Sequence, residues 1–174
     1  CTAAPSGALR MSPDGATIVG AGSAASKREA TVYGSDLGVI APLKGFSDDV
    51  ASVAVGEKLI ACGEYRTIRL FDLETRASRG VLEKAHGGTV TCLALCGKKL
   101  VSASGDKSAK AWNTDTLALI TTFTGHTNWV FAVDLSDSVV ATGSHMPLIM
   151  PRLGDDSAAR GAEVKRVSDA IAAA

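Results

Sequence analysis

Short apolar runs separated by polar turns cover most of the chain, and apolar and polar positions alternate within many of these runs. The clearest set is Thr89–Leu95, then Leu100–Ser104, then Ser108–Asn113, with a short polar turn after each of the first two runs. Alternation with a period of two is typical of β-strands that have one face buried. Turns this short join antiparallel neighbours. The pattern therefore predicts an all-β chain.

The same set of runs recurs at a fixed interval. Gly45-Phe46, Ala85-His86 and Gly125-His126 stand 40 residues apart, and each pair opens a unit of similar layout. A period near 40 residues with four strands per unit is typical of propeller blades. The expected units are residues 8–44, 45–84, 85–124 and 125–154, which together place a repeat domain over 1–154 and an Ala-rich tail over 155–174.

The third unit carries the most specific residues. It opens on His86, has Ser102 and Asp106 around its second strand, and closes on Trp112-Asn113, while the second unit closes on Phe71-Asp72. With its period near 40, this pattern resembles the WD40 family of β-propeller proteins. The resemblance implies a propeller arc of about four blades that serves as a binding platform. It also implies that His86, Ser102, Asp106 and Trp112 form a hydrogen-bonded structural tetrad.

The first and last units are degenerate. The first ends on Tyr33-Gly34 in place of Trp-Asp, and the fourth loses the pattern after Ser144, where two prolines fall in the expected third strand. In the tail, Val164, Val167 and Ile171 have helical spacing. The tail is therefore expected to be a short helix or disordered.

About four units is the low end of the range for a closed propeller. Since the chain begins with Cys1 rather than Met, we expect a piece of a longer protein whose further blades, or a second chain, close the ring. Each blade buries its faces against its neighbours, so an open arc exposes two apolar faces. Residues 1–174 alone are therefore expected to associate rather than to form a stable monomer.

Charge and cysteine usage narrow the function. The chain has 18 basic and 18 acidic residues and a formal net charge of +0, which argues against general binding to nucleic acid or to anionic membranes. No apolar run is long enough to span a bilayer, and no signal peptide is visible. Cys62 and Cys92 fall inside predicted strands, and Cys92 and Cys96 lack a second ligand pair for zinc. We therefore expect buried thiols, an intracellular location, and neither a metal nor another cofactor.

The tetrad residues also match the composition of a catalytic triad. His86, Ser102 and Asp106 would be the residues of a serine hydrolase, but no oxyanion element or nucleophile elbow accompanies them. The structural interpretation is therefore favoured. In the second unit, Phe46, Ala61, Tyr65 and Phe71 are expected at the four tetrad positions. The fourth unit keeps His126 and Thr142 and has Met146 where Asp belongs.

The leading hypothesis is a non-enzymatic scaffold for protein or peptide partners. The resemblance implies that partners bind on the top face, near the starts of the innermost strands and the turns that precede the tetrad Asp, which gives the candidates Asp49, Glu64, Thr89, Gly105, Trp129 and His145. An alternative is substrate recognition in a ubiquitin-ligase complex, because short turns such as Val55-Gly56-Glu57-Lys58 are similar to those of propellers in such receptors. The serine hydrolase is the third hypothesis.

Overall fold

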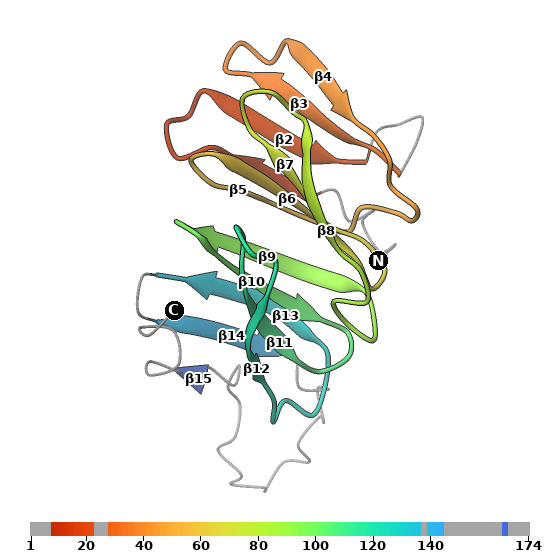
Figure 1. Ribbon diagram of the computed structural model, residues 1–174, viewed down its shortest axis with the longest axis vertical. Coiled ribbons are helices and arrows are strands. Elements are labelled where there is room, and N and C mark those ends of the chain that lie inside the picture. Colours follow the sequence, from red (N-terminus) through yellow and green to blue (C-terminus); the bar gives the residue numbers. More distant parts are fainter. Residues whose placement is uncertain (1–7, 23–27, 137–138, 145–164, 167–174) are drawn as a thin grey trace, which may run out of the picture.

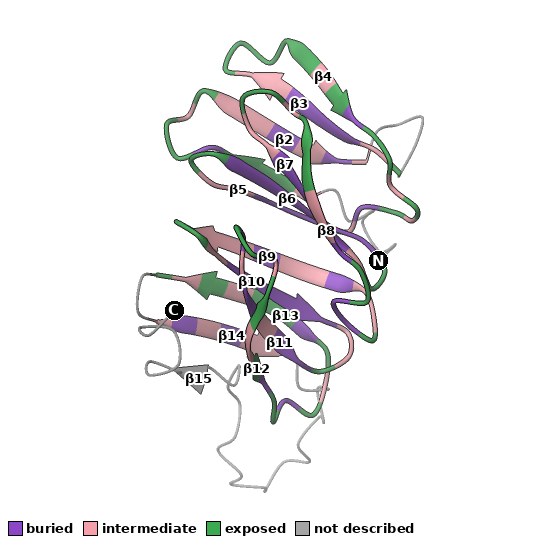
Figure 2. Ribbon diagram, in the orientation of Figure 1, coloured by how far each residue is buried: buried purple, intermediate pink, exposed green. Residues whose placement is uncertain are grey.

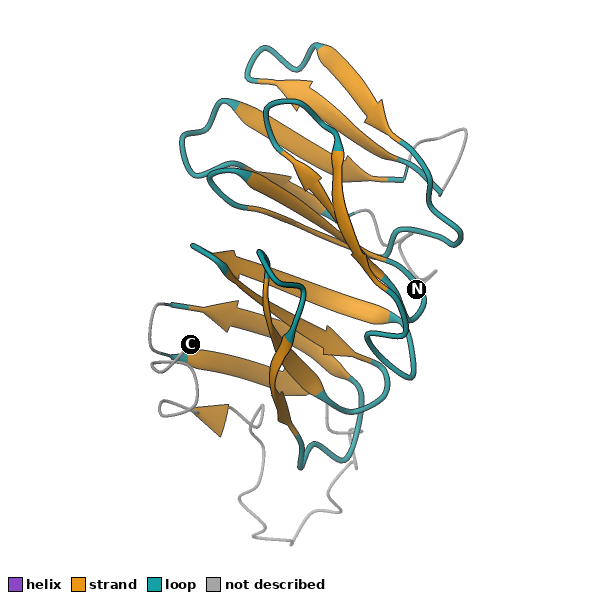
Figure 3. Cartoon of the chain, viewed as in Figure 1, coloured by secondary structure: helices purple, strands orange, loops and turns teal. Residues whose placement is uncertain are grey.

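The chain folds into four antiparallel sheets, as the sequence predicts (Figure 1). The computed structural model describes residues 8–22, 28–136, 139–144 and 165–166. Within these ranges the chain forms strands, turns and loops and no helix (Figure 3).

Sheet one contains β1 (Leu9–Met11), β2 (Thr17–Ala21), β3 (Ala30–Gly34) and β4 (Val39–Leu43). Sheet two contains β5 (Ser52–Val55), β6 (Leu59–Gly63), β7 (Ile68–Asp72) and β8 (Ser78–Leu82). Sheet three contains β9 (Val90–Cys96), β10 (Lys99–Ser104), β11 (Ala109–Asn113) and β12 (Leu119–Phe123). Sheet four contains β13 (Val130–Leu135), β14 (Val140–Ser144) and β15 (Lys165–Arg166).

Within each sheet the strands pair in chain order, and the consecutive strands of sheets one to three are antiparallel neighbours. The same irregularity recurs in sheets one to three. The register between the third and the outer strand shifts just before Tyr33, Phe71 and Trp112. Such a bulge bends the strand and increases its twist. The three sheets therefore share one geometry, although their sequences differ.

Consecutive sheets stack along their innermost strands, β1, β5, β9 and β13. Three apolar cores lie between them. One joins sheets one and two around Val32 and Ile60, the next joins sheets two and three around Leu70 and Leu100, and the last joins sheets three and four around Val101. Because each core takes side chains from two sheets, a sheet is stable only beside its neighbours.

Burial changes along the arc (Figure 2). In the middle, every residue of β6 is buried, as are all residues of β10 after Lys99. Both faces of these strands are therefore covered. At the two ends, β2 and β14 alternate between buried and partly exposed positions, so only one face of each is covered. Leu9 and Met11 in β1 are 62% and 59% exposed, and Phe131 in β13 is 51% exposed. Each end of the arc therefore presents an apolar face.

The tail differs from its expectation where it is described. Lys165–Arg166 form a strand that pairs with Thr142 and Ala141 of β14, so these two residues are neither helical nor irregular. Val164, Val167 and Ile171, which suggested a helix, lie outside the described residues, as do the two prolines after Ser144.

Candidate functional site

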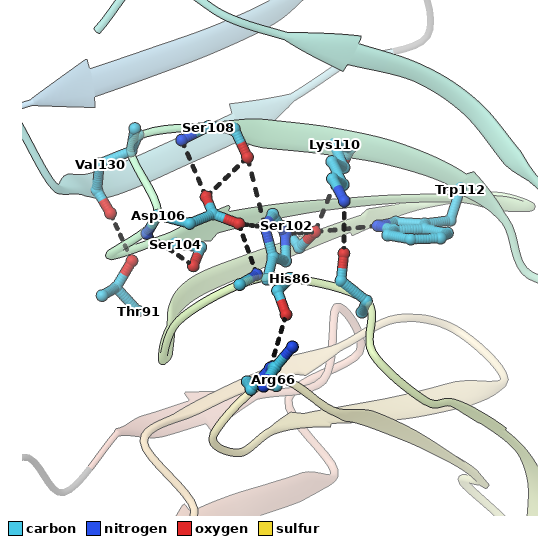
Figure 4. Close-up of polar contacts among 12 residues, drawn as sticks. Arg66, His86, Thr91, Ser102, Ser104, Asp106, Ser108, Lys110, Trp112 and Val130 are labelled. Atoms are coloured by element: carbon cyan, nitrogen blue, oxygen red, sulfur yellow. Dashed lines mark hydrogen bonds and ion pairs between the residues drawn. The ribbon is translucent and has the colours of Figure 1, made fainter. Parts of the chain in front are cut away.

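The polar network of sheet three joins the four residues expected to form a tetrad (Figure 4). His86 Nδ1 lies 2.9 Å from Asp106 Oδ2, and His86 Nε2 lies 2.7 Å from Ser102 Oγ. Trp112 Nε1 donates to Ser102 Oγ over 2.9 Å. Asp106 also accepts from the backbone N–H groups of Gly87 and Ser108 and from the Ser108 hydroxyl. The network therefore ties the loop before β9 to β10, to β11 and to the turn between them.

The protons of this network can be placed from its acceptors. Burial would raise the pKa of Asp106, but hydrogen bonds from Ser108, Gly87 and His86 outweigh it and lower the pKa to about 2. The carboxylate is therefore ionised and can only accept, so His86 Nδ1 carries the proton. Burial lowers the pKa of His86, which leaves Nε2 as an acceptor for the Ser102 hydroxyl. Every polar atom that links the four side chains is then satisfied.

This proton arrangement matches that of a serine hydrolase, but access to the serine does not. Ser102 has no exposed surface and His86 is 2% exposed. The Ser102 oxygen accepts from Trp112 on one side while its hydroxyl faces His86. A nucleophile must approach its substrate to near contact distance, and this hydroxyl is enclosed by the sheet. The geometry therefore favours a structural network.

Sheet two places different residues at these positions. The strand register sets Cys62, between Val53 and Arg69, where sheet three has Ser102 between Leu93 and Lys110. The expectation of Ala61 is therefore wrong by one residue. Cys62 is fully buried, and burial raises the pKa of its thiol far above the ordinary value. It behaves as a small apolar side chain, as expected.

An aromatic pair replaces histidine and tryptophan in sheet two. The rings of Phe46 and Phe71 lie 5.7 Å apart and tilted, where the rings of His86 and Trp112 lie 6.5 Å apart and edge to face. Apolar and polar versions of one site therefore occur in consecutive sheets. The exchange is physically consistent, because a buried polar network that is only half satisfied costs more than an apolar one.

Glu64 is the main correction to the predicted partner-binding residues. Its side chain is fully buried. One carboxylate oxygen lies 2.6 Å from Arg69 Nε, and the other accepts from the N–H groups of Ser47 and Asp48 over 2.7 and 2.9 Å. Glu64 therefore anchors the loop before β5, as Asp106 anchors the loop before β9, and its carboxylate is not available to a partner. Tyr65, expected at the Asp position of the tetrad, is instead 51% exposed.

The other predicted contact residues lie at one end of the sheets, which we call the top end. It contains the starts of β9 and β13 and the β6–β7 and β10–β11 turns. Here Thr89 pairs with Tyr65 of sheet two as an isolated antiparallel bridge, and the N–H of Gly105 donates to the carbonyl of Thr89. A Cβ atom on Gly105 would lie 3.1 Å from the Trp129 ring, so the indole rests on this backbone. Trp129 remains 46% exposed.

Asp49 is exposed at the same end, before β5, while His145 lies outside the described residues. The structure therefore brings Thr89, Gly105 and Trp129 together at the top end. Tyr65 joins these candidate contact residues, and Glu64 is no longer one of them. The exposure of Tyr65 was not predicted, because the spacing of the repeat placed this residue in the buried tetrad.

In sheet four, His126 Nε2 lies 2.8 Å from Thr142 Oγ1, which repeats the bond between His86 and Ser102. Met146, the residue expected at the Asp position, lies outside the described residues. The described half of this sheet therefore keeps the histidine–hydroxyl bond of sheet three.

The opposite, bottom end holds a groove of about 880 Å³ between the turns of sheets two and three. Two ion pairs line it, Arg79 to Asp72 at 3.3 Å and Lys98 to Asp115 at 2.7 Å. Among the described residues, no group of three or more His, Cys, Asp or Glu side chains is arranged to hold a metal ion.

The family model "WD domain, G-beta repeat" matches residues 78–113 and 117–145. The chain carries WD40 repeats. Each matched repeat begins in the outer strand of one sheet and continues into the next, so one sequence repeat links two neighbouring blades. From here the sheets are called blades one to four.

Two curated relatives match this chain over segments of nearly equal length. Nuclear distribution protein PAC1 of Komagataella phaffii is 36% identical over 74 residues, which are 40% of this chain and 15% of the relative. Ribosome assembly protein 4 of Saccharomyces cerevisiae is 37% identical over 73 residues, which are 39% of this chain and 14% of the relative. The chain thus spans about one seventh of these proteins.

Two solved structures share the fold. The WD40 repeats of RRP9 and the structure of U3-55K each align with a TM-score of 0.70 at 22% identity, over 79% of this chain and 44% and 45% of theirs. Identity this low supports the propeller fold alone. In the part of the chain that the structure describes, no helix is long and apolar enough to cross a membrane.

Proposed function

We propose that this chain is a non-enzymatic scaffold that binds protein or peptide partners at its top end. The observation that carries the proposal is the pair of half-exposed aromatic side chains, Tyr65 and Trp129, on either side of Thr89 and Gly105. Large aromatic residues are enriched among the residues that dominate binding energy at interfaces. The polar groups beneath them are buried and satisfied, and therefore serve the fold rather than chemistry.

Photo-crosslinking in the whole protein tests this proposal. A benzoylphenylalanine replaces Tyr65 or Trp129, and in the control it replaces Leu119, which is 48% exposed on an outer strand. Irradiation in cells should yield discrete protein adducts from positions 65 and 129 that are absent from position 119. The same adducts from all three positions, or none from 65 and 129, would contradict the proposal.

The absence of hydrolase activity is part of the same proposal. Because Ser102 is enclosed, a fluorophosphonate probe should leave it unmodified in the folded protein, and stoichiometric labelling would overturn the assignment. No observation among the described residues favours the ubiquitin-ligase alternative over a general scaffold. An intracellular location is also part of the proposal, and the names of the two curated relatives, which refer to nuclear distribution and ribosome assembly, support it.

A further inference from the structure

Two basic residues occupy the same place in consecutive blades. Arg66 ends the β6–β7 turn and Lys107 lies in the β10–β11 turn, each one residue before a Thr or Ser that leads into the next strand. Both have left-handed backbones, with φ of 65° and 70°. Glycine adopts this conformation easily, whereas residues with a Cβ atom adopt it at a cost. The turn itself therefore gives no reason for a long cationic side chain.

Packing does not explain these two residues either. Leu117 has a comparable left-handed backbone in a bottom-end turn, and its side chain covers Gly80 of the neighbouring blade, where a Cβ atom would lie 2.6 Å from Leu117 Cδ1. Arg66 and Lys107 are exposed. Arg66 reaches only the carbonyl of His86, over 3.4 Å (Figure 4). Neither residue forms an ion pair with any described residue, so their charges are available.

The carboxylates nearest to them are already engaged. Asp106 accepts hydrogen bonds from three residues, and Glu64 is paired with Arg69. Asp48 and Asp49 lie in the loop before β5, which Glu64 holds from the same turn as Arg66, but neither forms an ion pair with Arg66 or Lys107. The boundaries between blades two, three and four therefore present positive charge, although the chain as a whole is neutral.

Aromatic surfaces flank these charges. Tyr65 precedes Arg66 and pairs with Thr89 of blade three. Trp129 rests on Gly105, two residues before Lys107, and its ring centre lies 5.9 Å from that of Phe131. The top end therefore presents two cations, each close in the chain to an exposed aromatic side chain or to the residue that supports one.

We propose that this surface binds an extended protein segment in which Asp or Glu residues alternate with apolar ones. The carboxylates pair with Arg66 and Lys107, and the apolar side chains pack on Tyr65 and Trp129. A guanidinium can bind a carboxylate through two parallel hydrogen bonds. A protein segment fits better than nucleic acid, because binding a phosphate backbone depends on a broad positive field, which a chain of zero net charge lacks. The inference rests on the proposed scaffold function and names the chemistry of its partner.

The test uses fluorescence anisotropy on the whole protein. The probes are a labelled peptide that alternates Glu with Phe and Leu, the same peptide with Gln in place of Glu, and a labelled oligouridylate. The acidic peptide should bind more tightly than the Gln peptide. Arg66→Gln combined with Lys107→Gln should weaken binding of the acidic peptide about tenfold. Each exposed ion pair contributes a factor of at most about five to the affinity, and this variant removes two. Lys58→Gln with Lys98→Gln makes the same charge change at the bottom end and should leave affinity unaltered.

A second pair of variants separates binding from folding. Glycine suits a left-handed backbone, so Arg66→Gly and Lys107→Gly should keep or raise Tm. The same variants should lower the affinity for the acidic peptide.

Equal affinity for the Glu and Gln peptides would overturn the inference. If the crosslinks from positions 65 and 129 persist in that case, the scaffold proposal stands without it. If neither peptide binds and no crosslink forms, both proposals fail. Tighter binding of oligouridylate than of the acidic peptide, lost in the double Gln variant, would replace the protein segment by nucleic acid.

Discussion

Removing one hydroxyl from the blade-three network should destabilise the protein strongly. Ser102→Ala deletes an oxygen that is 2.7 Å from His86 Nε2 and 2.9 Å from Trp112 Nε1. Both partners are buried, at 2% and 7% exposure, and Ser102 itself has no exposed surface. Each unsatisfied buried polar group costs about 1–3 kcal/mol. With two such groups, the free energy of unfolding should fall by about 2–6 kcal/mol, measured from the urea midpoint of the whole protein.

A double-mutant cycle tests the cause of this loss. In a Trp112→Phe background, the indole N–H that Ser102→Ala would orphan is already gone. Ser102→Ala should therefore cost about 1 kcal/mol less there than in the wild type, which is the size of coupling expected for direct contacts. Additive effects, or a loss below about 0.5 kcal/mol in the wild type, would show that the tetrad does not act as a connected network.

Three further predictions follow from packing and charge. Gly63→Ala would place a Cβ atom 2.7 Å from Val90 Cγ1 of blade three and should lower the free energy of unfolding by about 1–3 kcal/mol, whereas Gly56→Ala meets only ordinary contacts and should be neutral within about 0.5 kcal/mol. Glu64→Ala leaves two N–H groups and Arg69 without their acceptor and should lower the free energy of unfolding in urea by about 3–5 kcal/mol. Unchanged stability with weaker partner binding would instead show that Glu64 contacts the partner. Acid should destabilise the protein in two windows, read from urea midpoints against pH. The pKa of His86 is lower when folded than its ordinary 6.5, so the unfolded chain binds more protons and stability falls as pH drops below 6.5. Asp106, with a folded pKa of about 2 against 3.8, adds a loss between about pH 3.8 and 2 that Asp106→Asn should remove, and an unchanged profile in that variant would refute it.

The repeat and its strands could be predicted because each strand is specified locally, by alternating apolar positions and by short turns at a constant interval. The blade-three network was predictable for the same reason, since the spacing from His86 to Ser102 and Trp112 matches the repeat. These signals needed no knowledge of contacts between blades.

Blade two could not be aligned in this way because its turn is one residue shorter. Five steps separate Gly63 from Ile68, whereas six separate the equivalent Ala103 and Ala109. Counting back from Phe71 therefore selected Ala61 instead of Cys62. The shorter turn also places the Glu64 carboxylate inside the blade, where it meets Arg69. Pairing of this kind depends on three-dimensional proximity that no periodicity reports.

The central claim is that these blades form an arc with an uncovered apolar face at each end. Thr91 donates its hydroxyl to the carbonyl of Val130 in the next blade. Phe131 occupies the position in blade four that Thr91 occupies in blade three, and its side chain is exposed. Leu9 and Met11 are exposed at the other end of the arc. Sedimentation velocity of residues 1–174 expressed alone tests the claim most directly. We predict concentration-dependent association or aggregation, because large apolar faces are not left in water. A monodisperse monomer with a cooperative thermal transition would contradict it.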